Sequence, residues 1–525
     1  MAGKPSKGCR TCVKRRIKCD ETRPECNRCK KSNRSCPGFI PPAVFHQTIF
    51  VGDKSERNAQ QEESSQDGAA SDAVSTHRPA LRSLTIFEYS GRIPQSLDLS
   101  GFTNNLYSSF LLNTYWSSNS QFRDHEQLNR QWFTQCLSDQ DKHPTSNLAL
   151  QALAMAFFGR KNFQEHIVLH SEAIYGRALR ALGNNIQNRI NIDSFDTLAA
   201  VTALSMFEYV ALTTYTGYIR HTQALARIVE HRGPEAFYQY PEKAILQAQR
   251  PLIMIQGLGA RKRCFLERPE WIAIHEHDVG IAPRTRSSFD KPMGELLNIF
   301  SRLPGIFEDV GKIRYQRIHE ALGTGMVDLA ALEDVTVRLH LFHNSLRGWQ
   351  ARFDEVFEDA RSEKRGDGIR ITRDAEGPVF QSILWWKCLE AANIWNLYTT
   401  IKMLSLEQQY MLDHPTYMYG YARDDLTDDH HWTDKLSQLR EMAFTIIRNV
   451  EYHLQPLHVN SGAFYILFPS RVAYMALDRS TREAKWLKVV IENMADKGGV
   501  ELARHILRAV TVQALNAFEG KNDDG

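Results

Sequence analysis

Residues 9–36 read CRTCVKRRIKCDETRPECNRCKKSNRSC. Two, six, six, two and six residues separate the six cysteines of this stretch. The second half repeats the cysteine spacing of the first half at a constant offset of 17 residues. Chance rarely spaces cysteines in this way, so we expect the six thiols to share one chemistry. The cysteines are Cys9, Cys12, Cys19, Cys26, Cys29 and Cys36.

Three chemistries compete for these thiols. Disulfides need an oxidising compartment, whereas the N-terminus is polar and basic and lacks the apolar segment of a secretory signal. A single zinc site would use the two Cys-x-x-Cys pairs, and Cys19 and Cys36 would then bind no metal. Two separate tetrahedral zinc ions would need eight thiolates, so six suffice only if two thiolates bridge both ions. We favour this bridged cluster, with Cys9 and Cys26, the first cysteine of each half, as the bridges.

The stretch resembles the fungal Zn2Cys6 binuclear-cluster DNA-binding domain. Residues 8–38 carry the likeness through the cysteine spacings, the basic run after the second cysteine, and Pro24 in the joining loop. Val13 departs from the pattern, because a basic residue is common there. In that family the first and fourth cysteines bridge the metal ions, which agrees with the count of thiolates. The resemblance implies two Zn²⁺ per chain, two short helices with loops, and double-stranded DNA as the partner.

Charge is segregated along the chain. Residues 1–40 contain 12 Lys and Arg against three Asp and Glu, which leaves 52 against 58 for the other residues. A small basic module on a mildly acidic body indicates a polyanionic partner for the module alone.

The basic residues of the module are the candidate DNA contacts. We expect residues 13–18 to form a short helix held by metal at both ends, with Ile17 turned inward. The resemblance assigns the reading of CGG-type half-sites to Arg16, and arginine suits the major-groove edge of guanine. The same runs fit nuclear localisation signals, so we expect a nuclear protein. The other expected contacts, mainly to phosphates, are Lys14, Arg15, Lys18, Lys30, Lys31 and Arg34.

The chain after the module changes character. Residues 51–80 have no aromatic residue and are rich in Gln, Ser, Glu, Asp and Ala, which predicts a disordered linker. We find no sustained heptad repeat after the module. A homodimer would therefore be held by the large domain, and a monomer bound to DNA is the alternative. The predicted domains are 1–50 for DNA binding, 51–80 for the linker and 81–525 for a large all-α domain.

Helical periodicity dominates the large domain. Residues 146–158 are apolar almost all round, with Ser146 as the expected cap, and predict a central helix. The pattern over 165–182 is expected to end at Gly183-Asn184. Asp193 or Ser194 is expected to cap the next helix, and Arg232-Gly233-Pro234 to end another. Further helices are predicted near 291–300, 331–358, 378–405, 434–453, 463–477, 482–495 and 499–517.

This region resembles the fungal-specific transcription-factor regulatory domain of the second type. Three stretches carry the likeness, at residues 221–234, 265–271 and 296–309. The resemblance implies an all-α regulatory domain, which in some relatives senses a small molecule. It transfers no ligand-binding residue to this chain.

The rest of the sequence contains no motif that indicates an enzyme. We find no P-loop, no G-x-G-x-x-G after a strand and no G-x-S-x-G, so we expect no enzymatic activity. His166 and His170 share a helix face without the HExxH order of a zinc hydrolase. Trp385, Trp386 and Trp395 are expected in the core or lining a pocket. No apolar run approaches the roughly 18 residues of a membrane span. Cys136, Cys264 and Cys388 are expected as ordinary reduced thiols.

Taken from the sequence, the leading hypothesis is a nuclear, sequence-specific regulator of RNA polymerase II transcription. A zinc-module scaffold or corepressor that binds protein rather than DNA is the alternative. A small-molecule effector of the helical domain is a further expectation.

Overall fold

The computed structural model of the chain forms two compact units, Met1–Arg92 and Ile93–Gly525. The predicted boundaries at residues 50 and 80, and the predicted linker between them, lie outside the described residues. The structure describes residues 12, 19–20, 22, 26–32, 36, 100–115, 132–139, 141–187, 191–274, 289–365, 373–374, 376–413, 430–455 and 458–507.

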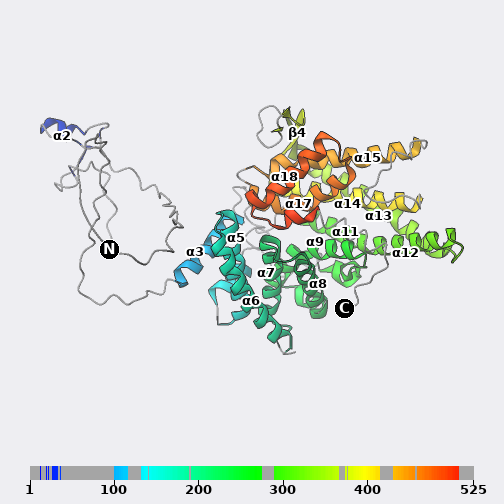
Figure 1. Cartoon of the computed structure of the whole chain (residues 1–525), viewed down its shortest axis with the longest axis horizontal. Helices are drawn as coiled ribbons and strands as arrows, with labels where there is room; N and C mark the ends of the chain where they lie inside the picture. Colours follow the sequence, from blue (N-terminus) through cyan, green and yellow to red (C-terminus); the bar gives the residue numbers. More distant parts are fainter. Residues whose placement is uncertain are drawn as a thin grey trace, which may run out of the picture. The chain divides into compact units, whose positions relative to one another are not determined.

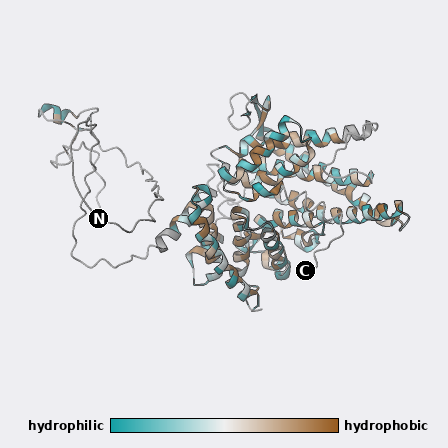
Figure 2. Cartoon of the chain, viewed as in Figure 1, coloured by the Kyte–Doolittle hydropathy of each residue, from teal (hydrophilic) through white to brown (hydrophobic). Residues whose placement is uncertain are grey.

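The second unit is largely helical, as predicted (Figure 1). Figure 2 shows that apolar residues are spread over nearly all of its helices, which therefore share one core. Its helices are α3 Ser100–Tyr115, α5 Pro144–Lys161, α6 Glu165–Gln187, α7 Phe195–Ala211, α8 Tyr215–Arg232, α9 Glu242–Ala260, α10 Pro269–Ala273, α11 Asp290–Phe300, α12 Leu303–Ala321, α13 Leu329–Phe357, α14 Leu389–Asp413, α15 His430–Ile447, α16 Val450–His453, α17 Val459–Ala476, α18 Arg482–Gly498 and α19 Leu502–Ile506, with short 3-10 turns η1 Pro234–Phe237, η2 Phe265–Glu267 and η4 Glu358–Ala360.

Three helices form the centre of the unit. Helix α7 buries every residue from Asp196 to Ala211, and it packs against α5, which is buried on most sides. Helix α14 is similarly buried and contacts α12, α13, α15 and α17. The predicted central helix near residues 146–158 is confirmed, because α5 is buried on most sides. Helices that are apolar all round are stable only inside a core.

The start of α5 differs from the prediction. The helix begins at Pro144, and His143 rather than Ser146 occupies the cap position. Ser146 is fully buried, and its backbone N–H donates to Asp196 Oδ1 at 2.8 Å. The N–H of Thr145 donates to the other oxygen of Asp196 at 3.2 Å. A carboxylate of the neighbouring helix α7 therefore satisfies the first N–H groups, which no local motif could show.

The end of α6 also differs from the prediction. The helix continues past Gly183-Asn184 to Gln187. The side-chain amide of Asn185 donates to the hydroxyl of Thr145 at 3.0 Å and to that of Thr197 at 3.3 Å. These tertiary hydrogen bonds hold the last turn in helical conformation where local propensity favours a stop.

The structure confirms two other predicted helix boundaries, the start of α7 and the end of α8. The hydroxyl of Ser194 accepts the N–H of Thr197 at 3.1 Å and caps α7. Helix α8 ends at Arg232, and Gly233 follows with a φ of 74°, a value that favours glycine.

Two short antiparallel sheets interrupt the helices. Strand β1 (Arg361–Arg365) pairs with β4 (Ser382–Trp386), so that Arg361 lies opposite Trp386. The predicted helix over 378–405 is therefore wrong in its first part, since β4 precedes α14. The large domain is therefore largely helical, whereas an all-α domain was predicted. The second sheet pairs β2 Arg373–Asp374 with β3 Gly377–Pro378.

A buried polar network joins β4 to α14 and α16. Trp386 Nε1 donates to Asn449 Oδ1 at 2.6 Å, and Asn449 Nδ2 donates to Asn396 Oδ1 at 2.8 Å. The Nδ1 atom of His453 lies 3.0 Å from the carbonyl oxygen of Asn449. Burial lowers the pKa of His453 to about 4, so this imidazole is neutral at pH 7. Trp386 and Trp395 are both buried, as predicted.

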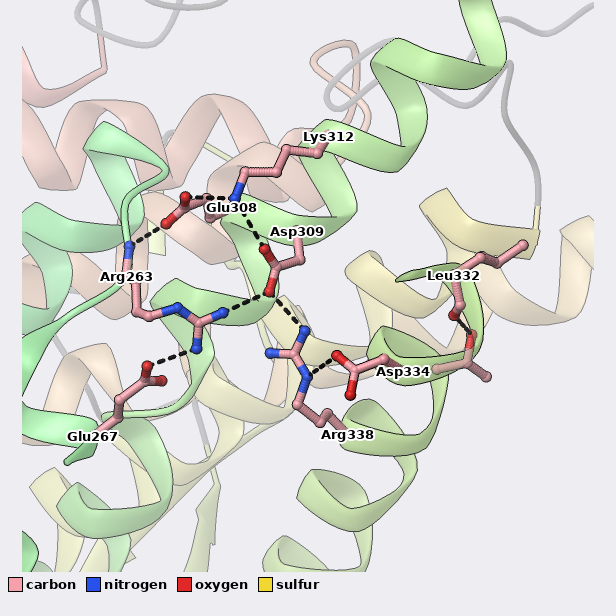
Figure 3. Close-up of polar contacts among 9 residues, drawn as sticks. Arg263, Glu267, Glu308, Asp309, Lys312, Leu332, Asp334 and Arg338 are labelled. Atoms are coloured by element: carbon pink, nitrogen blue, oxygen red, sulfur yellow. Dashed lines mark hydrogen bonds and ion pairs between the residues drawn. The ribbon is translucent and has the colours of Figure 1, made fainter. Parts of the chain in front are cut away.

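The three stretches that carry the family likeness in this unit meet in space. Glu230 of the first stretch pairs with Arg268 of the second at 2.7 Å. Just before the second stretch, Arg263 pairs with Asp309, which ends the third stretch, at 2.7 Å (Figure 3). A Cβ atom at Gly305 would lie 3.0 Å from Arg263 Nη1 and from Glu267 Oε2, so a larger residue there would require these two side chains to shift.

Asp309 is the centre of an ion-pair network that joins the loop after α9 to α12 and α13 (Figure 3). Its carboxylate lies 2.6 Å from Arg338, 2.7 Å from Arg263 and 3.2 Å from Lys312. Burial opposes ionisation of Asp309, but the hydrogen bonds from Arg338 and Lys312 outweigh it and hold the pKa below 3.8. The ionised form is therefore the one that stabilises the fold.

We expect the Asp309→Asn variant to lose about 1–2 kcal/mol of unfolding free energy at pH 7, since it removes three charge-assisted contacts at a partly buried site. The lowered pKa means that this stability is present above pH 4 and is lost as the pH falls through the pKa of the folded state. Urea denaturation followed by circular dichroism measures both effects. Asp334→Asn is the control, because its only ion-pair partner among the described residues is Arg338 and its side chain is 64% exposed. Equal losses in the two variants would contradict a central role for Asp309.

Two further expectations concern the surface. His166 and His170 are both exposed, and no third metal-binding side chain joins them among the described residues. In the part of the chain that the structure describes, none of the helices has the length and apolar character needed to cross a bilayer.

Candidate functional site

The described cysteines of the N-terminal stretch gather into one cluster. Cys12, Cys26 and Cys29 are at most 2% exposed, and Cys19 and Cys36 pack against them. The sulfur atoms of the three buried cysteines all lie within 4.8 Å of one another. A cluster of thiols with so small a core around it requires another source of stability.

The spacing of the sulfur atoms fits zinc. Cys12 Sγ and Cys26 Sγ are 3.8 Å apart. Two thiolates at about 2.3 Å from one tetrahedral zinc ion are roughly 3.8 Å apart, whereas a disulfide requires about 2.05 Å. The arrangement therefore favours shared metal ligation over a disulfide between these two residues.

Cys26 has the position expected of a bridging ligand. It belongs both to the group with Cys12 and Cys29 and to a second group with Cys19 and Asp20. A sulfur atom shared by two ligand groups can contact two metal ions. The other expected bridge, Cys9, lies outside the described residues.

Local structure orients the sulfur of Cys26. Helix α2 (Asn27–Lys31) begins directly after this residue, and Cys26 Sγ accepts the N–H of Cys29 at 3.3 Å. The N–H of Cys26 in turn donates to Cys36 Sγ at 3.5 Å. Hydrogen bonds from N–H groups stabilise the negative charge of thiolate ligands. The short helix has metal-binding residues at its start and within it, which explains how five residues stay helical.

The outer face of α2 is basic. Lys30 and Lys31 are exposed, as is Arg28. Arg28 was not among the predicted contacts, although its place in the Cys-x-x-Cys loop next to a repeat of the basic run could have indicated it. The remaining predicted DNA contacts lie outside the described residues, and they are Lys14, Arg15, Arg16, Lys18 and Arg34.

Asp20 is a second residue near the cysteine cluster that the sequence analysis did not name. Its carboxylate lies within 4.8 Å of the sulfur atoms of Cys19 and Cys26. Its position directly after the third cysteine was the available indication.

Comparison with known families agrees with this geometry. Residues 7–42 match the fungal Zn(2)-Cys(6) binuclear cluster domain. The match includes all six cysteines, and it assigns two zinc ions to the segment. Two zinc ions on this segment exclude the single-site alternative.

Two transcription regulators are similar to this chain over stretches of about 40 residues. The aspercryptin biosynthesis cluster-specific transcription regulator atnN of Emericella nidulans is 49% identical over 41 residues, 8% of this chain and 7% of that protein. The transcriptional regulatory protein moc3 of Schizosaccharomyces pombe is 52% identical over 42 residues, 8% of each chain.

One similarity is longer. The uncharacterized protein AN5342 of Emericella nidulans is 29% identical over 128 residues, 24% of this chain and 27% of that protein. These 128 residues exceed the 36 of the Zn(2)-Cys(6) match, so the likeness extends beyond the metal-binding segment. The chain spans about a quarter of AN5342 and less than a tenth of the two regulators. No solved structure matches the chain.

Proposed function

We propose that the protein is a nuclear transcription factor that binds specific DNA sequences through its Zn(2)-Cys(6) domain and regulates transcription by RNA polymerase II. The observation that carries the proposal is the cysteine cluster with exposed basic side chains on its short helix. A rigid, metal-held scaffold that presents cations outward suits the phosphates and base edges of duplex DNA. The regulatory functions in the names of atnN and moc3 support the proposal.

Within the module, we assign different roles to the two basic runs. Arg16 reads guanine in a CGG-type half-site, because a guanidinium forms two hydrogen bonds with the O6 and N7 atoms of guanine. Lys30 and Lys31 on α2 contact phosphates, and their exposure leaves them available for this. The further phosphate contacts are Lys14, Arg15, Lys18 and Arg34.

The helical unit is proposed to control the module as a fungal-specific regulatory domain of the second type. The support comes from the three family-like stretches. An ion pair joins the first to the second, and Arg263 pairs with both Glu267 of the second and Asp309 of the third. The proposal includes no catalytic activity. Dimer contacts, if the protein is a homodimer, would lie in this unit.

Replacement of Arg16 by alanine tests the proposal. We expect the Arg16→Ala variant to lose about 1–3 kcal/mol of discrimination between a CGG half-site and a scrambled site, while weak, salt-sensitive binding persists. Sites are first selected from random DNA with the full chain, and dissociation constants are then measured by fluorescence anisotropy at two salt concentrations.

The matched control is Lys30→Ala, which should weaken binding to both DNA sequences by the same factor. An equal loss on both sequences for Arg16→Ala would show that Arg16 does not read bases. Failure to enrich any sequence from random DNA would favour the protein-binding scaffold.

A further inference from the structure

Exposed apolar residues gather at one end of the helical unit. Among the described residues, five of the fourteen large apolar side chains that are exposed lie between residues 315 and 329. This stretch covers the second half of α12, the turn after it and the first residue of α13, at the edge of the unit (Figure 1). Single exposed apolar residues are normal on a monomer, whereas a group of them marks a surface for association. Each of the five is at least 45% exposed, and they are Tyr315, Ile318, Leu322, Met326 and Leu329.

Three of these residues form a stripe on the outer face of α12. Tyr315, Ile318 and Leu322 are three and four positions apart, so they lie on one face of the helix. Ile306 and Ile313 are buried and lie on the opposite face of the same helix. The stripe therefore faces away from the core.

Local contacts fix the aromatic ring of the stripe. The ring centroids of Tyr315 and His319 are 4.3 Å apart. His319 Nδ1 lies 2.8 Å from the hydroxyl oxygen of Thr324, and this hydroxyl donates to the carbonyl oxygen of His319 at 3.1 Å. These contacts tie the tyrosine to the turn after α12, so less conformational entropy is lost when a partner covers the ring.

Gly311 continues the stripe toward the start of α12, four positions before Tyr315. A Cβ atom at Gly311 would lie 3.7 Å from Arg261 Nη1, which is an ordinary van der Waals contact. The fold of one copy therefore does not require glycine at this position, although glycine weakens the interior of a helix relative to alanine. The missing side chain leaves a notch in the stripe that can receive a large side chain of another molecule.

The spacing of the stripe is the same in both directions. Gly311, Tyr315, Ile318 and Leu322 are four, three and four positions apart. When two copies of α12 pack antiparallel about a two-fold axis, Tyr315 faces Ile318 of the partner subunit, and Leu322 faces the notch at Gly311 of the partner subunit. A two-fold contact requires a surface that is complementary to itself in this way.

Charge favours the same antiparallel arrangement. Residues 311–318 contain three basic residues and no acidic one, whereas residues 319–337 contain four acidic residues and no Lys or Arg. An antiparallel pair brings the basic stretch of one copy toward the acidic stretch of the other, while a parallel pair would bring like charges together. The charged residues are Lys312, Arg314 and Arg317 in the first stretch, and Glu320, Asp328, Glu333 and Asp334 in the second.

We propose that the protein forms a homodimer in which the α12 helices of two copies pack antiparallel through the stripe Gly311, Tyr315, Ile318 and Leu322. Met326 and Leu329 extend the contact at each end. Covering the exposed apolar side chains on both copies buries on the order of 1,200 Å² in total, the lower limit for a specific, stable interface. We therefore expect a dimer that dissociates on dilution. Dimerisation through this stripe does not depend on the proposed recognition of DNA.

Sedimentation equilibrium of the zinc-loaded full chain, without DNA, measures the association. Between roughly 1 and 100 µM, we expect the native chain to pass from monomer to dimer. In the Ile318→Glu variant the dissociation constant of the dimer should rise at least about ten-fold, because a charge enters the centre of the contact. Met326→Glu, at an exposed turn residue, provides the same test if Ile318→Glu fails to fold. The control is Val356→Glu, at an exposed site near the other end of α13, which should associate as the native chain does.

Filling the notch tests the antiparallel arrangement. The Gly311→Leu variant should weaken the dimer at least about ten-fold, because the new side chain meets Leu322 of the partner subunit, although one copy has room for its Cβ atom. Adding Leu322→Ala to Gly311→Leu should restore the dimer, since the large and the small side chain exchange places. Circular dichroism of each variant checks that the helices are retained.

A native chain that remains monomeric over the whole concentration range would overturn the proposal, and so would an Ile318→Glu variant that dimerises as the native chain does. Failure of Leu322→Ala to restore the dimer of the Gly311→Leu variant would also overturn it. A monomeric native chain whose thermal midpoint falls in Ile318→Glu would show that the same chain covers the stripe instead. Because the measurements contain no DNA, these outcomes leave the proposed DNA recognition untouched. A chain that dimerises through the stripe and selects no DNA sequence would contradict only the proposed DNA recognition.

Discussion

Replacement of Cys26 by alanine is expected to remove both zinc ions and to lower the affinity for the selected DNA site at least about 100-fold. Cys26 is shared by the two ligand groups, so its loss leaves each metal ion with three thiolates. The metal supplies about 10–16 kcal/mol to the folding of small zinc modules, which cannot fold without it. Zinc is measured by native mass spectrometry and DNA binding by anisotropy.

The comparison with Cys36 makes this prediction specific. Cys36 is not shared between the two groups of described residues, so Cys36→Ala should retain one zinc ion more readily than Cys26→Ala does. Cys136→Ala is the matched control in the helical unit and should keep two zinc ions. Equal zinc loss from the Cys26 and Cys36 variants would show that Cys26 is not a bridge.

The Glu407→Gln variant is expected to be more stable than the native chain at high pH. Glu407 lies on α14, is 3% exposed, and has one carboxylate oxygen without a hydrogen-bond partner among the described residues. Burial raises its pKa from 4.5 to about 8, although Arg261 and Arg314 lower it. Glutamine has nearly the same shape and carries no charge to desolvate.

The raised pKa fixes the pH range of this effect. The folded state binds the proton more tightly than the unfolded state does, so native stability falls as the pH rises from 4.5 to about 8 and then levels off. The difference between these two values corresponds to at most about 5 kcal/mol. Urea denaturation at low and high pH should show a gain for Glu407→Gln only at high pH. The control Glu333→Gln, at an exposed site on α13, should show no such gain. A loss of stability at high pH in Glu407→Gln would refute the prediction.

The metal centre could be predicted well from the sequence because its chemistry is local. Six thiols lie within 28 residues, and two tetrahedral zinc ions can share six thiolates only if two of them bridge. The structure adds that Cys26 occupies both ligand groups and that Arg28 shares the basic face of α2. The roles assigned to residues 14–18 remain predictions, since those residues lie outside the described part of the chain.

The helix ends were harder to predict because tertiary contacts decide them. Asp196 satisfies the first N–H groups of α5 from 50 residues away, which makes the cap at Ser146 unnecessary. Asn185 extends α6 beyond a glycine that normally ends a helix. By contrast, Ser194 caps α7 by accepting a hydrogen bond from Thr197, only three positions along the chain, and such a local cap was predictable.

Strand β4 shows a different cause of error. Its sequence Ser-Ile-Leu-Trp-Trp is apolar and joins directly to a helical pattern, so periodicity alone assigns it to the helix. The aromatic and β-branched residues were the better indication.

The number of zinc ions on the full chain tests the central claim most directly. Native mass spectrometry should find two zinc ions per chain, and a chelator should remove both together with selective DNA binding. One zinc ion or none on the freshly purified chain, or selective DNA binding that survives complete removal of zinc, would contradict the account.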